Sequence, residues 1–159
     1  MPLSRYLLAA GLLFSAAACS QAPDPGTTPA ALPDRAALTR EIEAQFARSA
    51  RDWNAGNLEG FMSDYANDST TSYLSGGAVR YGYDRIRSGY APRFAPGAQR
   101  DSLHFENLAV RPLSGTLALV TARFILQREG RTTSSGPFTI IMERHAGGWK
   151  ILHDHTSSD

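Results

Sequence analysis

The chain has 159 residues, of which 42% are hydrophobic, 19% charged and 9% aromatic, a composition typical of one globular domain. Its 16 Lys and Arg residues almost balance its 15 Asp and Glu residues, and without a basic run the sequence offers no binding surface for DNA or RNA. A single Cys excludes both a disulfide framework and a Cys-based zinc site.

An export signal is predicted at the start of the chain. Arg5 precedes an uncharged run of 13 residues, 6–18, whereas a membrane-spanning helix needs about 20 residues. We therefore expect residues 1–18 to be a signal peptide that is removed. Small residues end the run directly before Cys19. This arrangement resembles the lipoprotein signal of bacteria, in which the Cys thiol is lipidated and becomes the mature N-terminus.

The lipoprotein resemblance implies a location. A lipidated Cys19 would anchor the protein in the bacterial cell envelope, facing the periplasm, whereas ordinary cleavage after Ala18 would leave it soluble in the periplasm or secreted. Residues 20–33 contain four prolines and no apolar periodicity. Residues 19–33 are therefore predicted to be the lipid attachment point and a tether. At about 3.1 Å per residue, such a tether holds a domain up to roughly 40 Å from the bilayer.

Three helices are predicted after the tether. The first is marked by apolar residues at spacings of three to four, which are Leu38, Ile42, Phe46, Ala50 and Trp53. Asp34 can cap its start and Gly56 can end it, which gives a helix of about 20 residues. A second helix is expected over residues 58–65 and a third over residues 83–90, the latter ending before Pro92.

Strands dominate the rest of the sequence. Residues 75–78 (SGGA) are a hairpin turn signal between two short β-prone segments. Longer strands are expected over residues 103–110, with a bulge at Asn107, and over 117–128, 137–144 and 149–156. Helices first and a meander of long antiparallel strands last predict an α+β fold, in which the helices cover one face of the sheet.

Several local strings, in this order, resemble the nuclear transport factor 2 fold, the cone-shaped α+β barrel shared by ketosteroid isomerase and SnoaL-like polyketide cyclases. The strings are residues 53–61 (WNAGNLEGF), 65–69 (YANDS), 82–87 (GYDRIR) and 148–157 (GWKILHDHTS). The resemblance covers residues 34–157. It implies a SnoaL-like domain with three N-terminal helices packed on a curved, mostly antiparallel sheet, and it implies a homodimer.

The resemblance also bears on steroid-isomerase chemistry. Ketosteroid isomerase has a carboxylate base in the strand after its second helix, and aligning residues 65–68 with the equivalent string places Tyr73 at that position. Ser72 lies beside it. Neither residue is a carboxylate, so the resemblance does not imply a steroid-isomerase base in this chain.

Two histidines of the last predicted strand are the main catalytic candidates. Strict alternation along the strand places His153 and His155 on the same face as Trp149 and Ile151. We expect that face to line the cone, because Trp149 and Ile151 are apolar. Imidazoles about 7 Å apart on one wall can act as acid and base near neutral pH, together with the Tyr73 hydroxyl and without a cofactor.

Two other interpretations of this histidine pair stay open. The imidazoles can begin a metal site, for which His104 or Glu143 would supply the third ligand. They can also be hydrogen-bonded strand residues that take no part in chemistry. We assign no metal ligands from the sequence.

Aromatic residues supply most of the candidate ligand contacts. Tyrosines gather around the second helix, the hairpin and the third helix, which rim the cavity mouth in the fold that the sequence resembles. Each tyrosine offers an apolar ring with a polar tip. Arg123 lies mid-strand among apolar residues, where it either pairs with Glu143 or Asp154 or grips an anionic ligand. The candidate ligand-binding residues are Trp53, Tyr65, Tyr81, Tyr90, Arg123, Phe138 and Trp149.

Two functional hypotheses follow. In the first, an envelope-tethered SnoaL-like domain binds a small, mostly apolar molecule in its cone, with cofactor-free proton transfer of the isomerase, cyclase or dehydratase type. In the second, a non-catalytic module dimerises or docks a partner, and side chains fill the cone. An open hollow of about 300 Å³ or more, lined by both histidines, would favour the first hypothesis.

Overall fold

The computed structural model describes residues 32–159. The predicted signal peptide, Cys19 and the predicted tether up to residue 31 lie outside the described residues. Within the described part of the chain, no helix is both long enough and apolar enough to cross a membrane.

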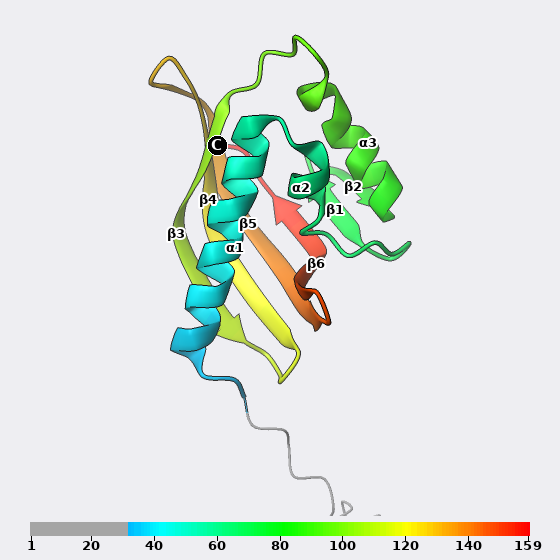
Figure 1. Cartoon of the computed structure of the whole chain (residues 1–159), viewed down its shortest axis with the longest axis vertical. Helices are drawn as coiled ribbons and strands as arrows, with labels where there is room; N and C mark the ends of the chain where they lie inside the picture. Colours follow the sequence, from blue (N-terminus) through cyan, green and yellow to red (C-terminus); the bar gives the residue numbers. More distant parts are fainter. Residues whose placement is uncertain (1–31) are drawn as a thin grey trace, which may run out of the picture.

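Helix α1 (Arg35–Ala55) runs along the length of the sheet (Figure 1). The side chain of Asp34 caps its first turn, and Gly56 ends it with a φ of 77°, as predicted. The buried stripe consists of Leu38, Ile42, Phe46, Ser49 and Trp53. Ser49 therefore takes the place predicted for Ala50, because a step of three residues keeps this stripe in line along the helix.

Helix α2 (Leu58–Met62) is shorter than the predicted helix over residues 58–65. The cause is a switch to strand-like pairing directly after it. The carbonyl of Asp64 accepts a hydrogen bond of 2.7 Å from the N–H of Ile151, and the N–H of Ala66 donates one of 3.0 Å to the carbonyl of Ile151. These bonds tie the end of α2 to the last strand of the sheet.

Helix α3 (Tyr83–Phe94) is longer than predicted, because Pro92 lies inside it instead of ending it. The helix stops at Ala95, whose backbone is extended with a ψ of 149°. Ala95 precedes Pro96, and the ring of a proline disfavours a helical conformation in the residue before it. The second proline of this segment therefore ends the helix.

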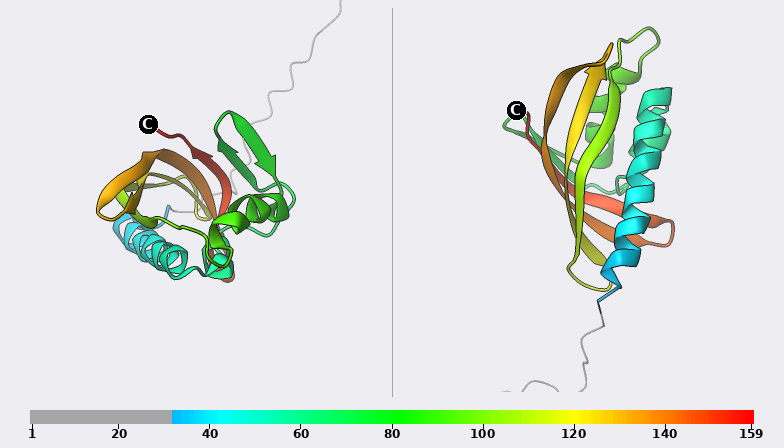
Figure 2. Two further views of the ribbon diagram at one scale, coloured as in Figure 1. Left: turned by 90° about the horizontal axis from the view of Figure 1, so that it is seen from above. Right: turned by 90° about the vertical axis from the view of Figure 1, so that its left-hand side faces the viewer.

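A curved sheet of six strands, in the order β2-β1-β6-β5-β4-β3, forms the second layer. The strands are β1 (Ser72–Ser75), β2 (Ala78–Tyr81), β3 (Ser102–Pro112), β4 (Leu117–Arg128), β5 (Arg131–His145) and β6 (Gly148–Thr156). Neighbouring strands are antiparallel except β1 and β6, which are parallel. Figure 2 shows the sheet curving around α1. The predicted α+β cone, with three helices on a mostly antiparallel sheet, is confirmed.

Two residues with positive φ shape the long strands. Asn107 has a φ of 56°, at the place where the register between β3 and β4 shifts, which confirms the bulge predicted there. Glu129 and Gly130 have φ values of 50° and 76°, and two successive positive φ values are typical of a tight hairpin turn. This turn lets β5 begin at Arg131, well before the predicted start at residue 137.

A bulge in β6 decides which of its side chains face the concave side of the sheet. Met142 of β5 pairs with Ile151, and the adjacent Ile141 pairs with His153, so Leu152 is an extra residue in β6. One extra residue reverses the alternation of side chains along a strand. The two faces of β6 are therefore exchanged beyond Leu152.

Candidate functional site

A hollow of about 180 Å³ lies between the second half of α1 and the concave face of the sheet. The side chains around it come from all three helices and from every strand except β2. The volume is below the roughly 300 Å³ of most ligand pockets. It exceeds, however, the cavity of about 150 Å³ that is known to accept benzene in a protein core. The hollow therefore has room for one ring.

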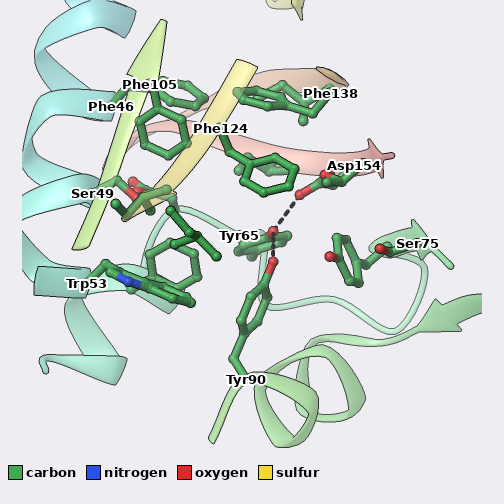
Figure 3. Close-up of a pocket in the computed structure, with 18 of the residues that line it drawn as sticks. Phe46, Ser49, Trp53, Tyr65, Ser75, Tyr90, Phe105, Phe124, Phe138 and Asp154 are labelled. Atoms are coloured by element: carbon green, nitrogen blue, oxygen red, sulfur yellow. Dashed lines mark hydrogen bonds between the residues drawn. The ribbon is translucent and has the colours of Figure 1, made fainter. Parts of the chain in front are cut away.

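Aromatic rings form the apolar wall, which we call the aromatic wall and define as Phe46, Phe105, Phe124 and Phe138 (Figure 3). The ring of Phe46 packs edge-on against Phe105 with centroids 5.0 Å apart, and it stacks on Phe138 at 5.8 Å. Such a wall favours a flat apolar ligand, because burying the ligand removes apolar surface from water on both sides.

A polar cluster interrupts this apolar lining. Asp154 of β6 is 6% exposed, and its Oδ2 accepts a hydrogen bond of 2.6 Å from the hydroxyl of Tyr65. Its Oδ1 accepts one of 2.7 Å from the hydroxyl of Thr156. The hydroxyl oxygens of Tyr65 and Tyr90 are 3.4 Å apart. In Figure 3, Tyr65 lies between Asp154 and Tyr90, so the three side chains form a chain along the hollow.

Burial controls the protonation of this cluster. Desolvation raises the pKa of Asp154, although the hydrogen bonds from Tyr65 and Thr156 act in the opposite direction. Desolvation, assisted by the nearby carboxylate, raises the pKa of Tyr65 well above its ordinary value, and desolvation does the same for Tyr90. The two tyrosines therefore keep their protons, and Asp154 is the member of the cluster whose charge can change.

A second buried carboxyl, Asp64, lines the side of the hollow next to α1. It accepts a hydrogen bond of 2.8 Å from Nε2 of Gln45 and forms an ion pair with Arg48. Desolvation raises the pKa of Asp64, and the charge of Arg48 opposes this shift. Because Asp64 is paired with a guanidinium and Asp154 with hydroxyls alone, Asp154 is the stronger candidate for proton transfer.

Neither predicted catalytic histidine lines the hollow. Because Leu152 is an extra residue in β6, Asp154 takes the inward place and His155 is exposed. His153 is half-buried, and its Nδ1 lies 2.8 Å from Oγ of Ser72 on β1. The expectation that both imidazoles line the cone is wrong, since it assumed a strand without a bulge.

The residues considered as further metal ligands are spread over the sheet. Nε2 of His104 lies 3.2 Å from a carboxylate oxygen of Glu106, and Nε2 of His145 lies 2.9 Å from one of Glu143. Across residues 32–159, no three His, Cys, Asp or Glu side chains come close enough together to hold a metal ion.

Several predicted site residues do meet at the hollow, which are Trp53, Tyr65, Tyr73, Tyr90 and Phe138. Tyr81 lies instead on the edge strand β2, where it is 58% exposed. Trp149 is 1% exposed in the core, and the guanidinium of Arg144 lies over its ring at 4.9 Å from the centroid. Trp149 and Tyr81 were expected to contact the ligand, and neither lines the hollow.

Arg123 does not reach the hollow either. Its neighbours in β4, Ala122 and Phe124, face the concave side, so alternation directs Arg123 to the outer face. There it forms an ion pair with Asp159. The expected pairing with Glu143 or Asp154 is wrong, as is the expected place in the binding site.

Sequence reasoning missed Asp154, Phe105 and Phe124. The two phenylalanines lie in strands that were predicted correctly, but nothing assigned their faces. For Asp154 a signal existed in the adjacent apolar pair Ile151 and Leu152. Two neighbouring apolar residues break the alternation of a strand and are compatible with a bulge.

The fold and the hollow define a class of protein, an α+β cone with a cavity between its helices and its sheet. The model of the SnoaL-like domain matches residues 42–158. The chain therefore belongs to the SnoaL-like family. Among curated proteins, none matches the chain.

Solved structures of the same fold come from several bacteria. A nuclear transport factor 2-like protein of unknown function from Shewanella oneidensis has a TM-score of 0.65 and 26% identity, over 76% of this chain and 98% of its own. A proposed scytalone dehydratase from Novosphingobium aromaticivorans has a TM-score of 0.65 and 14% identity, over 78% and 85%. A proposed calcium/calmodulin-dependent protein kinase II association domain from Xanthomonas campestris has a TM-score of 0.60 and 23% identity, over 84% and 95%.

Proposed function

We propose that this SnoaL-like domain binds a small, mostly apolar ring compound with one polar group, and that Asp154 moves a proton to or from that compound without a cofactor. The observation that carries the proposal is the buried Asp154 carboxyl in the same hollow as the aromatic wall, with hydroxyl groups as its hydrogen-bond partners. The solved structure of the proposed scytalone dehydratase, which has the same fold, supports proton-transfer chemistry of this kind.

The polar group of the ligand is expected to meet the polar cluster. A carboxylate has about four acceptor positions, and Tyr65 and Thr156 occupy two of those on Asp154. A hydroxyl group of the ligand can donate to a remaining position. The Tyr90 hydroxyl can donate to a carbonyl of the ligand instead. The aromatic wall then holds the ring, so the reacting carbon and the carboxyl lie in the same water-poor space.

A raised pKa suits Asp154 to proton transfer. A carboxylate whose pKa lies closer to neutral pH holds a proton more strongly than an ordinary carboxylate does. It is therefore a better general base. The Tyr65 hydroxyl, which keeps its own proton, would hold the Asp154 carboxyl in one orientation. Isomerisation, cyclisation and dehydration can each begin with the removal of a proton next to a carbonyl group.

Binding can be tested with two probes that differ only in whether the oxygen carries a proton or a methyl group. We expect 4-methylphenol to bind, and 4-methylanisole, which lacks the hydroxyl proton, to bind about tenfold or more weakly by calorimetry. Asp154→Asn should reduce that preference. Asp34→Asn is the matched control, because Asn caps a helix as well as Asp does and Asp34 lies outside the hollow. Equal affinities for the two probes in the unaltered protein would contradict a hydrogen bond to Asp154.

Proton transfer has its own assay. In deuterated buffer, the protein should catalyse exchange of the benzylic protons of 1-phenylpropan-2-one, which NMR follows directly. Asp154→Asn should abolish the exchange and Asp34→Asn should preserve it. Exchange at an unchanged rate in Asp154→Asn would show that the carboxyl is not the base.

Assembly without turnover is the second candidate, because the hollow is smaller than most ligand pockets and a neighbour of this fold is named as an association domain. This function and the proposed one both include the homodimer implied by the family resemblance, which sizing chromatography tests. The two functions differ in the part that the hollow plays. If assembly is the function, a side chain that blocks the hollow should change neither the formation of the dimer nor the binding of partner proteins.

We also propose that the domain is exported and anchored by a lipid on Cys19. The support is in the sequence, where an uncharged run and small residues precede the single Cys. The intact mass of the mature protein tests it: diacylglycerol on an N-terminal Cys is expected, and a bare thiol would leave the domain without this anchor.

A further inference from the structure

A second hollow, of about 310 Å³, adjoins the aromatic one. It lies between the β1–β2 hairpin and α3, and we call it the outer hollow. The two hollows share Tyr73, Ser75, Tyr90 and Arg93 among their lining residues. The two hollows therefore meet at these four residues, where a side chain of a ligand would have to pass from one hollow to the other.

The outer hollow is positively charged. Arg80 and Arg93 both line it, and no acidic side chain of residues 32–159 does. Arg48 of α1 and Arg87 of α3, in contrast, are paired with Asp64 and Glu59. None of the ion pairs within residues 32–159 involves Arg80 or Arg93.

Arg80 is an exposed residue whose guanidinium lies next to Tyr73. In the hairpin, Arg80 pairs directly with Tyr73, and its guanidinium carbon lies 5.8 Å from the centre of the Tyr73 ring. The Nε atom of Arg80 lies 3.5 Å from the place where a Cβ on Gly89 would stand. Gly89 of α3 thus leaves room for the guanidinium, which is held next to a ring that lines both hollows.

Arg93 belongs to the last turn of α3, opposite the hairpin. Because Arg93 lines both hollows, it marks the boundary between the apolar and the charged space. A guanidinium binds a carboxylate through paired N–H donors and is the side chain best suited to this task. Two guanidinium groups, those of Arg80 and Arg93, line the outer hollow.

We propose that the ligand of this domain is an aromatic carboxylate, with its ring against the aromatic wall and its carboxylate between Arg80 and Arg93. This inference rests on the proposed function, because it assumes that the aromatic hollow takes the ring. It adds the chemical class and the orientation of the ligand. The anionic end lies outward, and the opposite end of the ring points to the Asp154 cluster.

The test compares acids with their neutral amides. The probes are 2-phenylacetate, 3-phenylpropanoate and 4-phenylbutanoate, each paired with its amide, so that the chain length that spans both hollows is found by calorimetry. The best acid should bind about five- to tenfold more tightly than its amide at low salt. That advantage should shrink in high salt, which screens exposed charges.

Variants assign the effect to the two arginines. Arg80→Gln and Arg93→Gln should each reduce the advantage of the acid over its amide, and the double variant should remove that advantage. Arg85→Gln is the matched control, because Arg85 is an exposed residue of α3 that does not line either hollow. Arg85→Gln should leave the advantage of the acid over its amide intact. This variant also controls for the loss of one positive charge from the protein.

The outcomes separate this inference from the proposed function. If acid and amide bind equally well, or if Arg85→Gln lowers the acid advantage as much as Arg93→Gln does, the anion site is wrong and the ring site stands. If neither the acids nor the amides bind to the folded, unaltered protein, the ring site is wrong, and the inference built on it is overturned as well.

Discussion

The hydroxyl of Tyr65 donates a hydrogen bond of 2.6 Å to Oδ2 of Asp154, and the two side chains are 4% and 6% exposed. The two residues are joined by the backbone as well, because Tyr65 forms an isolated parallel bridge with Ile151 at the start of the β6 bulge. The bulge, the end of α2 and the buried carboxyl are therefore parts of one arrangement.

Asp154→Asn should change how stability depends on pH. The pKa of Asp154 is raised above 3.8 in the folded protein. Between the unfolded and the folded value, the folded state binds more protons, so the free energy of unfolding falls as pH rises. Asn does not ionise, so the variant should gain stability relative to the unaltered protein as pH increases from about 4 to 8 in urea unfolding. A difference that does not change with pH would contradict a raised pKa.

Tyr65→Phe should destabilise the protein by about 1–3 kcal/mol, because it removes a hydrogen bond from a buried carboxyl. Urea unfolding at constant pH measures this loss. Tyr73→Phe is the control within the same hollow, since no hydrogen bond of its hydroxyl holds Asp154. Similar losses in the two variants would mean that the Tyr65 hydroxyl has no special part in the cluster.

Filling the hollow should abolish binding while keeping the fold. Ser49 is 6% exposed and lines the hollow, so the ring of Ser49→Phe would occupy the space of a ligand. We expect at least about a tenfold loss of affinity for 4-methylphenol, with an overpacking cost of about 1–3 kcal/mol. Ala47→Phe, on the exposed side of the same helix, should keep the affinity. Unchanged binding in Ser49→Phe would place the ligand elsewhere.

Gly136→Ala should displace the segment after β6. A Cβ on Gly136 would stand 1.9 Å from the backbone oxygen of Ser157 and 2.9 Å from Cα of Ser158, which lines the hollow. We expect a loss of about 1–3 kcal/mol and faster hydrogen exchange at the Ser157 N–H, which donates to Pro137. Gly147→Ala meets no atom within 4 Å and should be close to neutral. A neutral Gly136→Ala would mean that this segment is not packed on β5.

Periodicity and caps predicted the fold, because α1 and the long strands repeat a local pattern along their whole length. The site was harder to predict, since it depends on single residues that break such a pattern. Leu152 shifts Asp154 inward and His155 outward, and alternation alone predicted the reverse. Arg123 was predicted to pair with Glu143 or Asp154 or to grip an anionic ligand, but its partner Asp159 lies in the segment after β6. Of the tyrosines that the resemblance placed around the cavity mouth, Tyr73 and Tyr90 line the hollow, whereas Tyr81 does not.

The most direct test of the central claim is an NMR titration with 4-methylphenol that follows the ring signals of phenylalanine and histidine together. If the aromatic hollow is the binding site, the signals of Phe105, Phe124 and Phe138 should shift in proportion to occupancy, and those of His153 and His155 should stay in place. Shifts confined to the two histidines would contradict this account, and so would unchanged phenylalanine signals at saturating 4-methylphenol.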